Sequence, residues 1–162
     1  MLHLNGREVI NRKIGEVDHS ADDYTLLGYS NSQYQHIHMP AKCYPSLDAG
    51  QVVASDANAW TLGAITEVIP AGEMTKAFDV HYIMVEAATS NEVYEIALLG
   101  GAEGSEVEIG RVRTFKATNQ TGANAVQIQI PVQHVGERIS AQLASETGDE
   151  SLTISLFLHE YE

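Results

Sequence analysis

Two histidines have a spacing that could bind a metal ion. His36 and His38 stand two residues apart, and side chains at i and i+2 of a β-strand point to the same side. Such a pair can share an ion when the fold brings a third ligand, such as His81 or a carboxylate. The alternative, which we favour, is that His36 and His38 form hydrogen bonds within or between chains.

Catalytic patterns receive less support. Metal-dependent jelly-roll enzymes called cupins pair a His-x-His dipeptide with a nearby downstream glutamate, but the first acidic residue after His38 is Asp48. The glycine-rich stretch 100–104 lacks the Lys-Ser/Thr of a phosphate-binding loop, and the chain contains no Gly-x-Ser-x-Gly. With 22 Asp and Glu residues, some acidic pairs arise by chance. We therefore predict that the protein is not an enzyme and has no catalytic, cofactor-binding or metal-binding residue.

Three other residues have a functional and a structural interpretation. Cys43 is the only cysteine, so the chain forms no internal disulfide, and we expect a small buried or half-buried side chain. Trp60 could stack against a sugar, but a predicted strand places Leu62 on the same face and favours packing in the core or an interface. Asn119 begins a glycosylation-type Asn-Gln-Thr pattern that we interpret as a turn.

The charge balance excludes some partners. The 162 residues include nine Lys and Arg against 22 Asp and Glu, which gives a net charge of −13. Nucleic-acid affinity comes largely from basic groups that neutralise phosphates, so we predict no nucleic-acid binding. No stretch approaches the roughly 20 apolar residues of a membrane span, and the first residues do not resemble a secretion signal. We expect neither membrane insertion nor secretion by that route.

Alternating hydrophobic residues predict β-strands from residue 36 onward. The inward-facing sets are Val126, Ile128 and Ile130; Leu152, Ile154, Leu156 and Leu158; Ile139, Ala141 and Leu143; and Val107 and Ile109. Gly110 interrupts this phase and predicts a bulge or bend. Segments 78–87 and 94–99 are apolar on both faces, which is typical of central strands covered on both sides.

Turn-forming residues recur every 10 to 20 positions. Segment 60–69 reads as a strand that ends at Pro70-Ala-Gly72, and similar breaks follow the other strands. Seven or eight short strands with this spacing predict an all-β sandwich or barrel.

The first 34 residues lack the regular hydrophobic pattern of the rest of the chain. No period of 2 or 3.6 persists there, so the segment is either a frayed tail or an extended arm ordered against a neighbour. About 30 extended residues reach up to ~100 Å, and we favour the arm. The predicted organisation is an N-terminal arm over residues 1–34 and a β-sandwich domain over residues 35–162.

Several stretches within residues 36–160 resemble a family of head decoration (cement) proteins of tailed bacteriophages. They are residues 36–50, 59–63, 67–72, 78–82, 85–87, 91–96, 108–113 and 119–120. The resemblance implies a jelly-roll sandwich that forms a homotrimer and binds the major capsid protein on the outer surface of the head, after assembly in the host cytoplasm. The first 35 residues do not match this texture.

The predicted function is therefore structural. A trimer that holds several shell subunits would stabilise the capsid against the pressure of packaged DNA, because multivalent attachment makes individually weak contacts strong. The alternative is a sugar- or receptor-binding jelly-roll module of a phage head fibre or tail, in which Trp60 would contact the ligand. A cupin-like metal enzyme is the third hypothesis.

Overall fold

The computed structural model describes residues 41–161, and in this range the chain is built from β-strands. The strands are β1 (Ala41–Tyr44), β2 (Gln51–Ala54), β3 (Thr66–Ile69), β4 (Phe78–Ala88), β5 (Glu92–Gly100), β6 (Val107–Lys116), β7 (Asn124–Gln127), β8 (Ile139–Ser145) and β9 (Ser151–Glu160). Within the described range, no helix has the length and hydropathy needed to span a bilayer. The predicted arm over residues 1–34, His36 and His38 lie outside the described residues.

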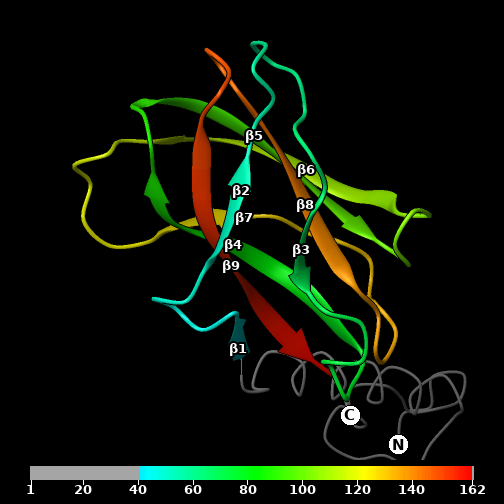
Figure 1. Ribbon diagram of the computed structural model, residues 1–162. Coiled ribbons are helices and arrows are strands. Elements are labelled where there is room, and N and C mark those ends of the chain that lie inside the picture. Colours follow the sequence, from blue (N-terminus) through cyan, green and yellow to red (C-terminus); the bar gives the residue numbers. More distant parts are fainter. Residues whose placement is uncertain (1–40, 162) are drawn as a thin grey trace, which may run out of the picture. The chain divides into compact units, whose positions relative to one another are not determined.

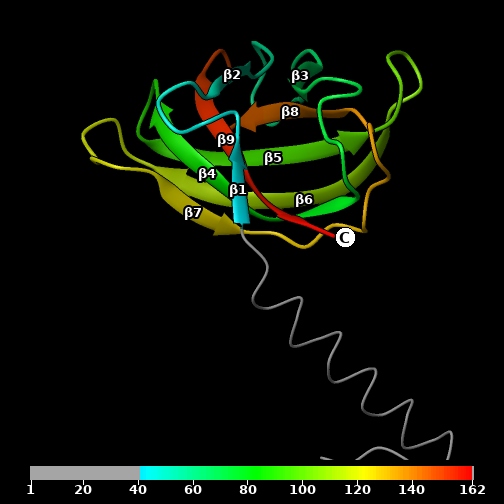
Figure 2. The same ribbon diagram turned by 90° about the horizontal axis from the view of Figure 1, so that it is seen from below.

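The strands form two antiparallel sheets that pack face to face (Figure 1 and Figure 2). Sheet A has the order β1-β9-β4-β7, with β2 also paired to β9, and sheet B has the order β3-β8-β5-β6. β1 pairs with the second half of β9 and β2 with the first half, so the two short strands share one position at the edge. Eight strand positions that pass between two sheets in this order are a jelly roll. The predicted jelly-roll-like antiparallel β-sandwich is confirmed.

The core lies between the two sheets. Three of the predicted inward-facing sets are confirmed, since the members on β8 and β9 are at most 1% exposed and Ile128 and Ile130 are buried beyond β7. In the fourth set, Ile109 packs against the core, but Val107 is 66% exposed because it lies at the very start of β6. Alternation therefore predicted the core well, except at a strand end.

Two features, one turn and one strand irregularity, follow from the glycine positions. β3 ends at Ile69, directly before the predicted turn, and Gly72 there has a φ of +82°. The expected irregularity near Gly110 is a β-bulge, because Leu98 pairs with Gly110 while Leu99 pairs with Glu108. A side chain at Gly110 would meet Ile130 at 2.9 Å, so glycine lets β6 approach the core here.

Two predictions about individual strands are wrong. Trp60 is not in a strand, since β3 begins only at Thr66 and Trp60 has a left-handed φ of +57°. Its segment follows the edge of β8 instead, through backbone bonds from Trp60 N to Ser145 O and from Gly63 N to Leu143 O. β4 is central as predicted, but its outward face is not fully covered within the described chain, because Tyr82 is 36% exposed.

Candidate functional site

The outward face of sheet A carries a group of apolar side chains among polar ones such as Thr153, Ser155 and Gln127. Its strands present side chains that alternate with the core residues: Val52, Ala54, Tyr82, Met84, Ala87, Ala125 and Phe157. Val52 is 54% exposed, and Tyr82 makes an edge-on contact with Phe157 at a centroid distance of 6.1 Å. We call these seven side chains the apolar face. An outward sheet face normally carries polar residues, so the exposed Val52 and Tyr82 are unusual for a solvent-facing surface.

The two carboxylates that face outward on sheet A are both engaged. Glu86 accepts a hydrogen bond from the Ser155 hydroxyl and a second, of 2.9 Å, from the Asp48 backbone N–H. Asp79 is 8% exposed and lies at the far end of β4. Nearby, burial raises the pKa of the half-buried Cys43 thiol, and the charge of Glu86 raises it further.

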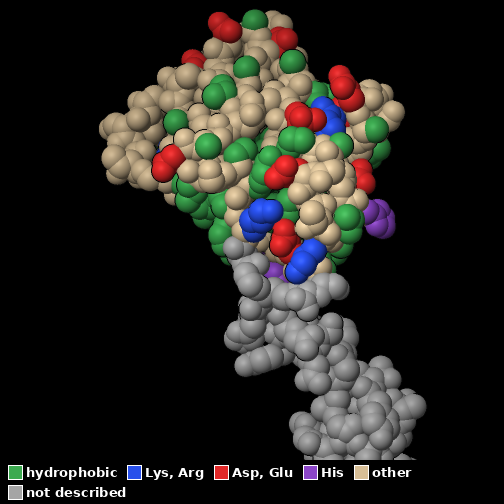
Figure 3. All heavy atoms as spheres, turned by 60° about the horizontal axis from the view of Figure 1, so that its bottom comes forward, with side chains coloured by type: hydrophobic (Ala, Val, Ile, Leu, Met, Phe, Trp, Pro, Cys, Tyr) green, Lys and Arg blue, Asp and Glu red, His purple; other side chains and the backbone are tan. Residues whose placement is uncertain are grey.

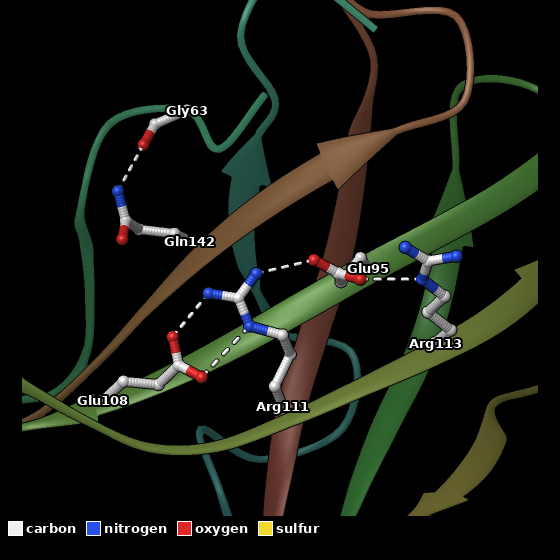
Figure 4. Close-up of polar contacts among 6 residues, drawn as sticks. All are labelled: Gly63, Glu95, Glu108, Arg111, Arg113 and Gln142. Carbon is white, nitrogen blue, oxygen red and sulfur yellow. Dashed lines mark hydrogen bonds and ion pairs between the residues drawn. The ribbon is translucent and has the colours of Figure 1, made fainter. Parts of the chain in front are cut away.

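The outward face of sheet B carries a cluster of paired charged side chains, next to the exposed Phe115. Glu95 on β5 accepts a bond from Arg111 at 2.6 Å and one from Arg113 at 2.7 Å, while Arg111 also forms a two-point contact with Glu108 (Figure 4). The hydrogen bond from Arg113 is the main reason that the pKa of Glu95 is lowered, although partial burial opposes it. Glu108 and Glu95 in turn raise the pKa of Arg111. We call these four side chains the charged face.

A third arginine connects two loops to this sheet. Arg138 donates to Glu67 at 2.6 Å and to Glu106 at 2.7 Å. The side chains of Arg138 and Glu106 are only 11% and 6% exposed, and the Arg138 hydrogen bond lowers the pKa of Glu106. This pair stabilises the loop that leads into β6.

Trp60 lies over the charged face. The Arg113 guanidinium carbon is 4.5 Å from the centroid of the indole ring, which is a cation–π contact. Trp60 is 42% exposed, so it is not a core residue. Near it, Gln142 donates to the Gly63 carbonyl at 2.7 Å and holds the preceding loop on β8 (Figure 4).

A third group of side chains lies where β4 and β9 pair near the end of sheet A. Asp79 is the cross-strand partner of His159, and the register shift between Val80 and Tyr82 makes His81 the extra residue of a bulge. His81 Nε2 lies 3.1 Å and His159 Nδ1 lies 3.8 Å from Asp79 Oδ1. We call Asp79, His81 and His159 the Asp-His-His cluster.

Tyr161 completes the surroundings of this cluster. Its hydroxyl donates a 2.7 Å hydrogen bond to Asp79 Oδ2, and its ring contacts the His159 ring edge-on at 4.8 Å. Burial and the Asp79 carboxylate both raise the pKa of Tyr161, so the phenol keeps its proton at neutral pH. The His81 and His159 rings stack with centroids 5.5 Å apart.

The fold brings together residues that the sequence did not connect. His81 was expected only as a third ligand for His36 and His38, which lie outside the described residues. The alternation of Asp79 and His81 at i and i+2 was a visible signal, but the third member, His159, is 78 positions further along the chain. Its place could not be found without the pairing of β4 with β9.

Acidic side chains are dispersed over the surface. On the face shown in Figure 3, Asp and Glu side chains are scattered among hydrophobic and polar ones, and the few Lys and Arg side chains lie close to acidic ones. In sheet B, the described arginines are paired with glutamates. The surface in that view has no basic patch of the kind that binds nucleic acid.

No protein-family model and no curated protein matches the chain. Among solved structures, the chain is similar to the Eiger TNF of S. frugiperda, with 10% sequence identity and a TM-score of 0.40. The match covers 76% of this chain and 93% of the Eiger TNF chain.

Proposed function

We propose that this protein is a structural virion protein that forms trimers on the outer surface of a tailed-phage head. The observation that carries the proposal is the contrast between the two outer sheet faces. A chain with a net charge of −13 places two engaged carboxylates on the outward side of sheet A, and it gathers arginines and glutamates on sheet B. The sequence resemblance to head decoration proteins supplies the class of assembly.

The apolar face suits contact with another copy of the chain. Contiguous exposed apolar surface usually marks an interaction site, and a face without unengaged charge lets two acidic molecules approach with little repulsion. β9 has ten residues and four strand positions lie side by side, so the sheet face measures roughly 600 Å² at about 3.3 Å per residue and 4.8 Å per strand. This is of the order of the ~800 Å² that each partner buries in a stable interface.

A threefold arrangement needs two different patches on each copy, because a cyclic trimer is built from head-to-tail contacts. The apolar face offers two halves, one on β2 and β9 with Val52 and Phe157, the other on β4 and β7 with Tyr82 and Ala125. We place the first half of one copy against the second half of the next. The charged face would then point away from the threefold axis.

Mass measurement in solution tests the assembly. Light scattering on the full chain should give three times the 17.6 kDa chain mass, and Val52→Asp or Tyr82→Asp should each yield monomers, because either places an unpaired charge in the contact. The matched control is Val107→Asp on sheet B, a valine that is also exposed, which should leave the trimer intact. A monomeric wild-type chain, or trimers that survive both apolar-face substitutions, would contradict the proposal.

Attachment to capsids needs a separate measurement. The purified trimer should sediment with expanded phage heads that lack their decoration protein, with a fixed number of copies per shell subunit. Heads that carry the protein should release their packaged DNA at a higher temperature than heads without it. If the protein binds saturably but the heads gain no heat resistance, the result would support attachment to the capsid and refute the stabilising role.

One observation favours a second candidate function. Trp60 is exposed beside a charged face, and an exposed indole can stack on a sugar ring. Arg113 already contacts this indole ring, which reduces the surface available to a ligand. A glycan array with a specific hit that Trp60→Ala abolishes would support a sugar-binding module instead of a cement protein.

A further inference from the structure

We propose that the Asp-His-His cluster binds one divalent transition-metal ion, with zinc as the best match. The inference goes beyond the proposed function and does not depend on it. One ligand atom from each of Asp79, His81 and His159 lies within 4.8 Å of the other two. Imidazole nitrogen and carboxylate oxygen are among the preferred zinc ligands.

The distances fit a small ion. Zinc bonds of about 2.1 Å in tetrahedral geometry require ligand atoms about 3.4 Å apart. The separations from Asp79 Oδ1 are 3.1 Å to His81 Nε2 and 3.8 Å to His159 Nδ1, so two of the three separations bracket this value, and the two histidine nitrogens lie within 4.8 Å of each other. The sites of the three side chains are also fixed by the backbone, because Asp79 and His159 are cross-strand partners and the bulge keeps His81 on their side.

The surroundings of Asp79 also support a metal site. The Tyr161 hydroxyl donates to Oδ2 and thereby orients the carboxylate, as outer-shell partners of metal ligands do. Oδ1 is buried, and no described residue donates a hydrogen bond of good geometry to it, although His81 Nε2 is close. A bound cation would satisfy this oxygen.

Three protein ligands leave a fourth position on a tetrahedral ion. Since Asp79 and His81 belong to β4 and His159 to β9, the ion would link these two strands of sheet A near the end of β9. The bound metal would therefore stabilise the folded chain, because it binds the native state and not the dispersed ligands of the unfolded state.

A zinc titration tests the proposal on the full chain, without a histidine tag and after treatment with a chelator. Calorimetry and metal analysis should give one zinc per chain, with magnesium binding at least a hundredfold weaker because this ligand set contains imidazole. His81→Ala should weaken zinc binding at least tenfold. The matched control is His134→Ala, an exposed histidine outside the strands, which should leave the affinity unchanged.

Further variants test whether the zinc ion binds at the Asp-His-His cluster. Tyr161→Phe should weaken zinc binding about tenfold through the lost orientation of Asp79, and the double variant His36→Ala/His38→Ala should bind as the wild type does. Absence of zinc binding overturns the proposal and leaves an Asp79–His81 ion pair. Unchanged binding by His81→Ala, or its loss in the His36/His38 variant, places the ion elsewhere and also overturns it.

A spectroscopic measurement on the wild-type chain tests the proposal without relying on variants that must fold. X-ray absorption of the zinc-loaded wild-type chain should show two imidazole ligands and oxygen ligands. A zinc–sulfur distance of about 2.3 Å would assign the ion to Cys43 and refute the cluster.

Discussion

Glu95 joins two arginines through separate carboxylate oxygens, and this arrangement makes its contribution to stability depend on pH. The pKa of Glu95 is lower in the folded chain than in the unfolded chain, where glutamate titrates near 4.3. The stabilisation is therefore fully present above about pH 4.3 and is lost as the pH falls through the folded value.

We predict that Glu95→Gln lowers the free energy of unfolding by about 1 kcal/mol at pH 7, a value that allows for the exposure of both arginines. The difference from the wild type should shrink below about pH 4. Urea unfolding at pH 7 and pH 3, at one protein concentration, measures both values. Glu103→Gln on an exposed loop is the control, and an equal loss at both pH values would contradict the argument.

Two glycines with the same left-handed backbone conformation differ in the space around them. Alanine substitutions at these positions therefore distinguish the cost of backbone strain from the cost of a steric clash. Gly148 and Gly104 have φ values of +85° and +80°. A Cβ at Gly148 would lie 2.4 Å from the Ala57 carbonyl oxygen, whereas a Cβ at Gly104 would meet nothing within 4 Å. Gly104→Ala should cost about 1 kcal/mol from the left-handed backbone alone.

Gly148→Ala should cost about 2 kcal/mol more, because the clash is with backbone that cannot rotate away. Thermal unfolding of the two variants, measured side by side, gives the difference. Equal melting temperatures would show that the loop of Ala57 moves at little cost.

At the scale of elements, the sequence predicted the strands whose side chains alternate cleanly. Leu152 to Leu158 and Ile139 to Leu143 face the core because one side of each strand is covered by the opposite sheet. Trp60 was misplaced because its left-handed backbone interrupts the strand, and a single side chain gives no sign of that conformation. His159 was missed because a contact between distant strands depends on pairing that local patterns do not encode.

β9 is the element on which sheet A depends, since it pairs with β1, β2 and β4. Leu156 is fully buried on its inward side, so Leu156→Ala should lower the free energy of unfolding by roughly 2–5 kcal/mol. Val107→Ala, at an exposed strand end, should change it by less than about 0.5 kcal/mol. Denaturant unfolding compares them, and similar losses would mean that Leu156 is not a core residue.

At the scale of the whole molecule, the net charge would oppose the proposed association between copies of the chain. Each copy carries −13, so an assembly held by an apolar contact must overcome mutual repulsion. Salt shortens the screening length from about 30 Å at 0.01 M to about 8 Å at 0.15 M.

We predict that the dissociation constant of the proposed trimer falls several-fold over this range of salt. Sedimentation equilibrium at the two salt concentrations measures it, and Val107→Asp, with one more negative charge per chain, should show a somewhat steeper dependence. Dissociation on adding salt would indicate that ion pairs, and not the apolar face, hold the copies together.

The pairing of β1 with β9 has a consequence for how the domain is made. Ala41 lies beside His159, so neighbours in sheet A are separated by more than 100 residues of chain. While the polypeptide emerges from the ribosome, β1 and β2 have no partner, and β4 has only β7, until residues 151–160 have been synthesised. Sheet A therefore closes late and slowly, as is usual for topologies dominated by distant contacts. During that interval, the unpaired edges of these strands stay accessible to chaperones.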